Sequence, residues 1–169
     1  MKLKVKSFLY KLFEFLFSFP EKLKYSLIKE KYNLPKDFKF NGKEIVFYGD
    51  GKIQIGSKSY IGSYSTVYVD KDCKVEIGNN CNISHNVRIY TLSNNPDVDF
   101  NVKPIANKKG NVIIGNAVWI GANVFINPGI TIGENAIVGA NSVVTKNIEP
   151  MAIYGGVPAK FIRYKKINE

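Results

Sequence analysis

The sequence predicts a mainly β protein, a prism of stacked six-residue repeats preceded by a helical segment. Isoleucine and valine recur at strict six-residue steps over residues 114–144, and the same step recurs over 55–67 and 77–89. This period fits neither the 3.6-residue repeat of a helix nor the two-residue alternation of a strand. It fits a coil with flat sides, in which each hexad gives one short strand and one corner. One hexad cannot bury its aliphatic residue alone, so the hexads must stack.

A second inward position and the corner residues support the same prediction. Four residues after each aliphatic residue of the main run comes another small or apolar one: Val118, Val124, Ile130, Ala136, Ser142 and Ile148. Asparagines that tolerate left-handed backbone angles crowd the expected corners: Asn79, Asn80, Asn82, Asn116, Asn123, Asn135 and Asn141. The period slips near residues 70–74 and is interrupted at 90–111. A polar loop on a rigid scaffold is where function usually sits.

The N-terminal segment reads as helix over residues 3–19, with Pro20 ending or kinking it, and a second short helix over 21–32. Its apolar run is too short and interrupted to span a membrane, and charges disfavour a signal peptide. Two interpretations stay open. Residues 1–20 pack on the prism or on a neighbouring subunit, or they lie on a membrane interface. We expect three parts: a basic helical segment at 1–40, the prism at 41–157 and a basic tail at 158–169.

The positive charge lies mainly at the two ends of the chain. Of a net charge of +10, residues 1–40 contribute ten lysines against four acidic residues. Basic ends favour anionic partners such as cofactor phosphates or an acidic membrane surface. The lack of interleaved aromatic residues argues against nucleic-acid binding. With two cysteines and one histidine, neither a disulfide framework nor a metal site is expected, and Cys81 reads as a core thiol in a reducing, cytoplasmic setting.

His85 is the only histidine and the best candidate for proton transfer at neutral pH. It follows Ile83 by two residues, so it stands at a corner and points out of the core. The plain alternative is a solvated surface histidine. Trp119 also points outward, and it either packs on the surface or forms a flat wall for a ligand. Asp97 lies in the long loop, where it either orients an acceptor hydroxyl or is simply solvated.

The hexads, followed by VWIGANVFINPGITIGENAIVGANSVVTKNI and then GGVPAKFIR, resemble the hexapeptide-repeat O-acetyltransferases. The resemblance covers residues 41–165 and is most specific at 112–163. It is closest to the maltose/galactoside acetyltransferase type and to the polysaccharide-modifying subgroup. It implies a left-handed parallel β-helix and a homotrimer. It also implies that acetyl-CoA, the acetyl donor, binds in clefts between adjacent prisms.

The resemblance also assigns site residues. Positions that line the acetyl-CoA cleft in the family match Ala122, Ala140, Thr145 and Lys146. Basic positions near the nucleotide match Lys160 and Arg163, where phosphates need cations. A tryptophan at the wall of the active site, beside both substrates, matches Trp119. We therefore expect these residues to bind the cofactor, and Trp119, Asn94 and Asp97 to contact the acceptor.

One departure from the family pattern concerns the base. The catalytic histidine of sugar acetyltransferases follows a Tyr-Thr-x-x sequence in the loop, where this chain has Asn94, which cannot accept a proton. Either His85 replaces it, or the chain is an inactive binding or scaffold trimer. We favour His85, and we expect an acetyl-CoA-dependent O-acetyltransferase acting on a sugar hydroxyl of a cell-surface polysaccharide or its precursor. We expect it in the cytoplasm, with a peripheral place at the inner face of the membrane as the alternative that residues 1–20 leave open.

Overall fold

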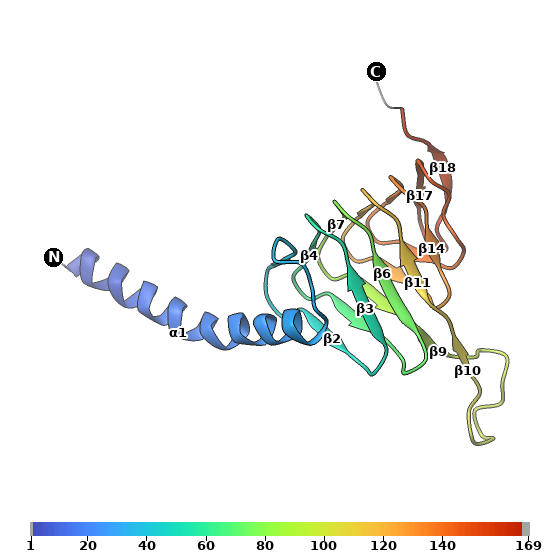
Figure 1. Cartoon of the computed structure of the whole chain (residues 1–169), viewed down its shortest axis with the longest axis horizontal. Helices are drawn as coiled ribbons and strands as arrows, with labels where there is room; N and C mark the ends of the chain where they lie inside the picture. Colours follow the sequence, from blue (N-terminus) through green and yellow to red (C-terminus); the bar gives the residue numbers. More distant parts are fainter. Residues whose placement is uncertain (1, 167–169) are drawn as a thin grey trace.

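A computed structural model describes residues 2–166 as one long helix followed by a parallel β-helix (Figure 1). The chain winds through about five coils, and the fold is the left-handed β-helix predicted from the resemblance. Each of the first four coils contributes one strand to each of three faces, and on the third face the fifth coil has only an isolated bridge at Ile148. The first face consists of β1 (Lys39–Asn41), β4 (Tyr60–Gly62), β7 (Asn82–Ile83), β12 (Trp119–Ile120), β15 (Ile137–Val138) and β17 (Ala152–Gly155), with β18 (Lys160–Tyr164) antiparallel at its end.

The other two faces are parallel sheets as well. The second face consists of β2 (Val46–Tyr48), β5 (Thr66–Tyr68), β8 (Arg88–Tyr90), β13 (Phe125–Ile126) and β16 (Val143–Val144). The third face consists of β3 (Lys52–Ile55), β6 (Lys74–Ile77), β11 (Val112–Ile114) and β14 (Thr131–Ile132). We call the turn from the first to the second face the first corner, the next turn the second corner, and the return to the first face the third corner.

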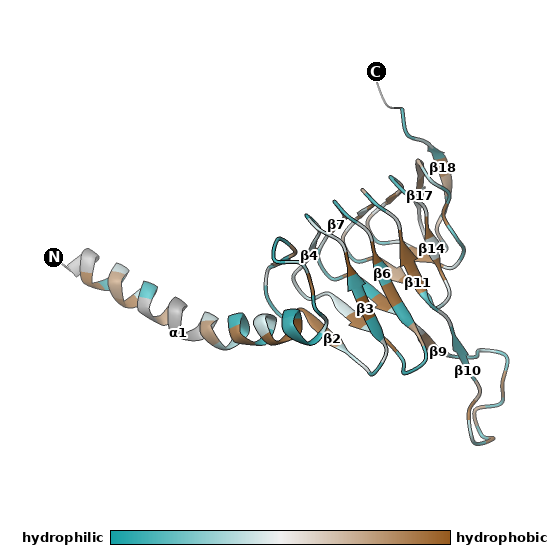
Figure 2. Cartoon of the chain, in the orientation of Figure 1, coloured by the Kyte–Doolittle hydropathy of each residue, from teal (hydrophilic) through white to brown (hydrophobic). Residues whose placement is uncertain are grey.

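The predicted inward residues form the core. Ile120, Ile126 and Ile132, which come from three different faces, are fully buried, and so are their hexad partners Val118 and Ala136. Each buried aliphatic side chain contributes about 1.5–3 kcal/mol to stability. In Figure 2 the hydrophobic residues of the strands alternate with hydrophilic ones across the faces. The register that the hexads predict is therefore confirmed.

Asparagines shape the corners in two different ways. Asn80, Asn86, Asn123, Asn135 and Asn141 adopt positive φ angles, as such corners require. The list of asparagines predicted for this role was partly wrong. Asn79 and Asn116 instead build a side-chain ladder, in which the Asn116 Oδ1 accepts a 2.8 Å hydrogen bond from the Asn79 amide, and Asn82 lies in a strand.

The N-terminal helix differs from the prediction. One continuous helix, α1 (Lys2–Lys31), runs through Pro20, so of the two outcomes predicted for this residue, an end or a kink, the end is wrong, and so is a separate second helix over 21–32. Proline removes one backbone hydrogen bond, which bends a helix without ending it when the flanking turns hold. Figure 1 shows α1 bending near its middle. In residues 2–166 no helix is long and apolar enough to cross a membrane.

Only the C-terminal end of α1 packs on the prism. The ring of Tyr25 stacks on that of Phe40 with centroids 4.4 Å apart. The Tyr25 hydroxyl also accepts a 3.1 Å hydrogen bond from the Ile45 amide, and Ile28 is buried. These contacts fix the helix to the first coil, and the rest of α1 extends away from the prism (Figure 1).

The long interruption at 90–111 contains a short β-hairpin. It projects from the second corner, and it contains β9 (Leu92–Asn94) and β10 (Asn107–Lys109) paired antiparallel. The slip in the period near 70–74 is a wider second corner between β5 and β6. Both cysteines are buried and free, as expected for Cys81, and burial raises the pKa of its thiol.

Candidate active site

His85 stands at the first corner, between β7 and β8, and its side chain is exposed as the sequence predicts. The ring lies against the coil before it, because a Cβ atom on Gly62 would come within 2.7 Å of the His85 Nδ1 atom. Only glycine, which has no Cβ atom, leaves room for the His85 ring at this position. The Ser63 amide then donates a 3.0 Å hydrogen bond to Nδ1. The preceding coil therefore fixes the orientation of the imidazole.

This hydrogen bond has a consequence for the tautomer. A nitrogen that accepts an N–H carries no proton, so in the neutral ring the proton is on Nε2. In this tautomer Nε2 can only donate a hydrogen bond and cannot accept a proton. The lone pair of His85 is held by the Ser63 amide. A role for Nε2 as base thus requires that amide to give up its hydrogen bond and the ring proton to move to Nδ1.

Small residues follow His85 along the same corner on the next two coils. The His85 carbonyl accepts a 3.0 Å hydrogen bond from the Asn123 amide, and the Ala122 carbonyl accepts one of 2.8 Å from the Asn141 amide. Side-chain amides join the coils too, with the Asn86 Nδ2 bonded to the Asn123 Oδ1 at 2.9 Å. Coils are stacked about 4.8 Å apart. His85, Ala122 and Ala140 therefore form one straight edge of the prism.

Trp119 lies on the first face, one coil beyond His85. It pairs with Asn82 on one side and Ile137 on the other, and it is 51% exposed. Asn82 is three residues before His85, which places the backbones of Trp119 and His85 on the order of 10 Å apart. The outward position predicted for Trp119 is confirmed. The tryptophan and the histidine occupy neighbouring positions on one side of the prism.

The residues matched to the cofactor gather toward the C-terminal end. Thr145 and Lys146 are exposed at the second corner of the last coil, immediately after β16. Lys160 and Arg163 lie on β18, and both are exposed. This end of the molecule is consequently basic, but Thr145 and Lys146 are separated from Ala140 by the width of the second face.

The loop residues lie away from His85 within one chain. Asn94 ends β9, and the Asp97 amide donates a 3.1 Å hydrogen bond to the Asn95 side chain in the turn that follows. Both site candidates are exposed. The loop leaves the second corner, whereas His85 is at the first, and strand β8 lies between them. A single chain therefore does not bring Asn94 or Asp97 to His85.

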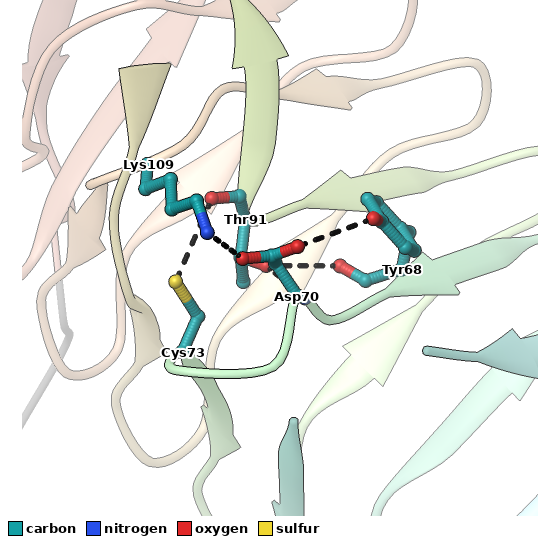
Figure 3. A network of polar contacts seen from close by, with 5 residues as sticks. All are labelled: Tyr68, Asp70, Cys73, Thr91 and Lys109. Carbon is teal, nitrogen blue, oxygen red and sulfur yellow. Dashed lines mark hydrogen bonds and ion pairs between the residues drawn. The ribbon is translucent and has the colours of Figure 1, made fainter. Parts of the chain in front are cut away.

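A polar network holds both ends of this loop (Figure 3). Thr91, before the loop, accepts a 2.8 Å hydrogen bond from the Asp70 amide, and Lys109, at its end, forms an ion pair with the Asp70 carboxylate. The Cys73 thiol donates to the Thr91 carbonyl at 3.8 Å. The Lys109 ammonium lowers the pKa of the Asp70 carboxyl, and Asp70 raises the pKa of Lys109.

Sequence reasoning missed this network. Asp70 and Lys109 are 39 positions apart, one in the slip of the period and one in the long loop, and neither belongs to a motif. Only the register between coils brings them together. The two irregularities in the hexad period thus meet at one corner, and the first supports the second.

The cavity of about 490 Å³ in the described structure lies elsewhere, between α1 and the first coil. Lys22, Tyr25 and Phe40 are among its lining residues, and none of the predicted site residues is. His85 and Trp119 instead lie on an open surface. A second wall is needed to enclose a substrate there.

Comparison with known proteins identifies the class. The family described as bacterial transferase hexapeptide (six repeats) matches residues 111–146. Galactoside acetyltransferase in complex with coenzyme A is 32% identical with a TM-score of 0.67, over 96% of this chain and 79% of that one. The chain belongs to the hexapeptide-repeat acyltransferases, as the resemblance predicted.

Two further relatives are also acetyltransferases. A hexapeptide-repeat acetyltransferase from Vibrio cholerae, complexed with acetyl-CoA, superposes with a TM-score of 0.72 at 28% identity, over 87% of this chain and 79% of that one. Polysialic acid O-acetyltransferase of Escherichia coli O1:K1 is 41% identical over 128 residues, which are 76% of this chain. The chain spans only 41% of the length of that relative.

Proposed function

We propose that this chain is an acetyl-CoA-dependent O-acetyltransferase that acts on a sugar hydroxyl of a cell-surface polysaccharide or of its precursor. The observation that carries the proposal is the edge formed by His85, Ala122 and Ala140, with Trp119 beside it. It combines the one imidazole of the chain with a track of small side chains along which an extended cofactor arm can lie. Family membership supports acetyl-CoA as the donor.

In the proposed reaction the acceptor hydroxyl attacks the carbonyl carbon of the thioester. The new C–O bond forms as the hydroxyl proton passes to Nε2 of His85, and the C–S bond then breaks. The thiolate of coenzyme A leaves and takes a proton, which restores the neutral imidazole. Backbone N–H groups near Ala122 would stabilise the developing oxyanion. For Nε2 to act as base, the Ser63 amide must release Nδ1 and the ring proton must move through solvent from Nε2 to Nδ1, which leaves the lone pair on Nε2.

The cofactor would lie between two prisms of a homotrimer. His85 and Trp119 are open to solvent in one chain, so a neighbouring prism would supply the missing wall. Thr145 and Lys146 of the last coil would line the cleft, and Lys160 and Arg163 would bind phosphates. The loop that carries Asn94 and Asp97 would then reach the His85 edge of a neighbouring chain rather than that of its own.

A glycan acceptor is supported by the 41% identity to polysialic acid O-acetyltransferase. Trp119 gives a flat apolar surface for a sugar ring, and Asn94 and Asp97 provide hydrogen-bonding groups on the loop. Two free buried cysteines fit a reducing compartment. We place the enzyme in the cytoplasm at the inner face of the membrane, where a lipid-linked glycan precursor would be within reach.

Two substitutions of His85 test the proposal. Thiol release from acetyl-CoA, measured with a panel of glycan acceptors, should fall about 10²–10⁴-fold in His85→Ala, because a general base is removed. His85→Gln should fall equally, since its amide donates a hydrogen bond but cannot take a proton. Near-normal turnover of His85→Gln would show that His85 acts only as a donor.

The second candidate function is an inactive binding or scaffold trimer. Asn94 in place of the family histidine, together with the Ser63 hydrogen bond to Nδ1, favours it. Such a protein would bind coenzyme A in a calorimetric titration yet release no thiol with any acceptor. An acetylated product, identified by mass spectrometry and absent with His85→Ala, excludes this candidate.

A further inference from the structure

One face of α1 carries large apolar side chains that the part of the chain described by the structure leaves uncovered. They are between 45% and 66% exposed, and they comprise Val5, Phe8, Leu9, Phe19, Leu23 and Leu27. At 100° per residue these positions fall within an arc of about 100° on the helix surface. Figure 2 shows hydrophobic bands on α1 beyond its contact with the prism. We call this arc the outward face.

The outward face points directly away from the prism. Glu21, Tyr25 and Ile28 are among the residues of α1 that face the first coil, and they centre about 180° from the outward face by the same helical geometry. Their contacts are specific, since the Glu21 carboxylate accepts hydrogen bonds from the Tyr25 hydroxyl and from the Glu44 amide. The prism of the same chain is therefore unable to cover the outward face.

Lysines border the outward face on both sides. Lys11 and Lys22 lie roughly 40–60° beyond one edge of the arc, and Lys6, Lys24 and Lys31 lie equally far beyond the other. Lys29 is on the first side too, but its ammonium donates hydrogen bonds to the Lys36 and Phe38 carbonyls. Glu30 falls inside the arc and ends the apolar surface after Leu27. An apolar stripe between two lysine rows is the pattern of a helix that lies in a membrane interface, with its lysines on the lipid phosphates.

We infer that residues 5–27 dock on an anionic lipid bilayer, with α1 lying in the plane of the interface over about 33 Å. The prism then stands on the aqueous side, because its contacts are on the opposite face of the helix. A coiled coil between copies of the chain is the competing occupant. It is disfavoured because the lysine rows of neighbouring helices would meet beside the seam, where opposite charges are needed.

Vesicle sedimentation of the full-length chain tests this inference without requiring catalysis. The wild-type protein should sediment with vesicles that contain phosphatidylglycerol and far less with pure phosphatidylcholine. Phe8→Asp/Phe19→Asp should weaken partitioning on the order of a hundredfold, because two aromatic side chains no longer insert. The matched control, Ser7→Asp/Ser18→Asp, adds the same charge on the other side of the helix and should weaken partitioning by less than about tenfold.

A second pair of substitutions tests the lysine rows separately. Lys6→Gln/Lys24→Gln should weaken binding to the anionic vesicles about thirtyfold, from roughly fivefold for each lysine, and should reduce its dependence on salt. Three outcomes overturn the inference. In the first, the wild-type chain stays in the supernatant with anionic vesicles at low salt. In the second, Phe8→Asp/Phe19→Asp and Ser7→Asp/Ser18→Asp bind the vesicles equally. In the third outcome, sedimentation velocity shows that Phe8→Asp/Phe19→Asp breaks an oligomer, which assigns the outward face to another copy.

Discussion

The position of the His85 ring depends on the absence of one carbon atom on the neighbouring coil. Gly62 packs beneath the ring, and the Ser63 amide bonds to Nδ1. The same position on later coils is Gly121 and Gly139, so the hexad pattern alone would class Gly62 as an ordinary corner glycine. Its specific role becomes visible only when the coils are stacked.

Gly62→Ala should therefore displace the imidazole and destabilise the fold. The new Cβ atom would lie 2.7 Å from Nδ1 and 2.8 Å from the Ser84 carbonyl, which is too close for either group. We expect the free energy of unfolding, measured in urea, to fall by about 1–3 kcal/mol. Gly139→Ala is the matched control, because its Cβ atom would meet nothing closer than 3.4 Å. Equal losses in the two variants would contradict the packing described for His85.

Asp70 gives a pH-dependent prediction. Lys109 holds the pKa of this carboxyl below its ordinary value of about 4, so the ion pair stabilises the folded state above that pH. The stabilisation is lost as the pH falls from about 4 through the lower folded-state pKa. The difference in unfolding free energy between wild type and Asp70→Asn should be constant above about pH 5 and shrink below pH 4. Asp72→Asn, an exposed neighbour outside the ion pair, serves as control, and the same shrinkage there would argue against the pair.

At the scale of elements, the regular strands could be predicted and the interruptions could not. Each hexad by itself predicts one short strand and one inward residue. Strands β12 to β16 therefore lie where the six-residue period predicts them. The sequence left open whether Pro20 ends or kinks the helix, because the local rule for proline allows both, and the structure shows that α1 continues through it. The β9–β10 hairpin has no apolar alternation that would predict its strands. Its place is fixed by the contacts of Thr91 and Lys109 with Asp70 on the coil before it.

Basic residues of strand β18 should bind the phosphates of the cofactor. Lys160 and Arg163 are both exposed on it, and each well-formed charge-assisted contact contributes about 1.5–3 kcal/mol. In calorimetric titrations Lys160→Ala/Arg163→Ala should weaken the binding of coenzyme A much more than the binding of dephospho-coenzyme A, because only coenzyme A carries the 3′-phosphate. Lys52→Ala/Lys58→Ala, on the first coil, should leave both affinities unchanged. Equal weakening of both ligands by the β18 pair would assign these cations another role.

At the scale of the whole molecule, the sequence is informative about one prism and much less so about the complete site. The period predicts the core and the outward positions of His85 and Trp119, and the resemblance in the motifs adds the family. It does not predict that Asn94 and Asp97 lie across strand β8 from His85, since that separation arises from the corners at which the coils turn. The edge of His85 is also open in one chain. These two facts together are the physical basis for expecting the complete site between chains.

The most direct test is a crystal structure of the full chain with coenzyme A bound. We predict a trimer in which the cofactor lies between two prisms along the edge of Ala122 and Ala140. Its sulfur should face His85 of one chain and the loop of the next, and Nδ1 should be released from the Ser63 amide once an acceptor is also present. Coenzyme A bound within a single chain, or with its sulfur remote from every His85, would contradict the proposed active site.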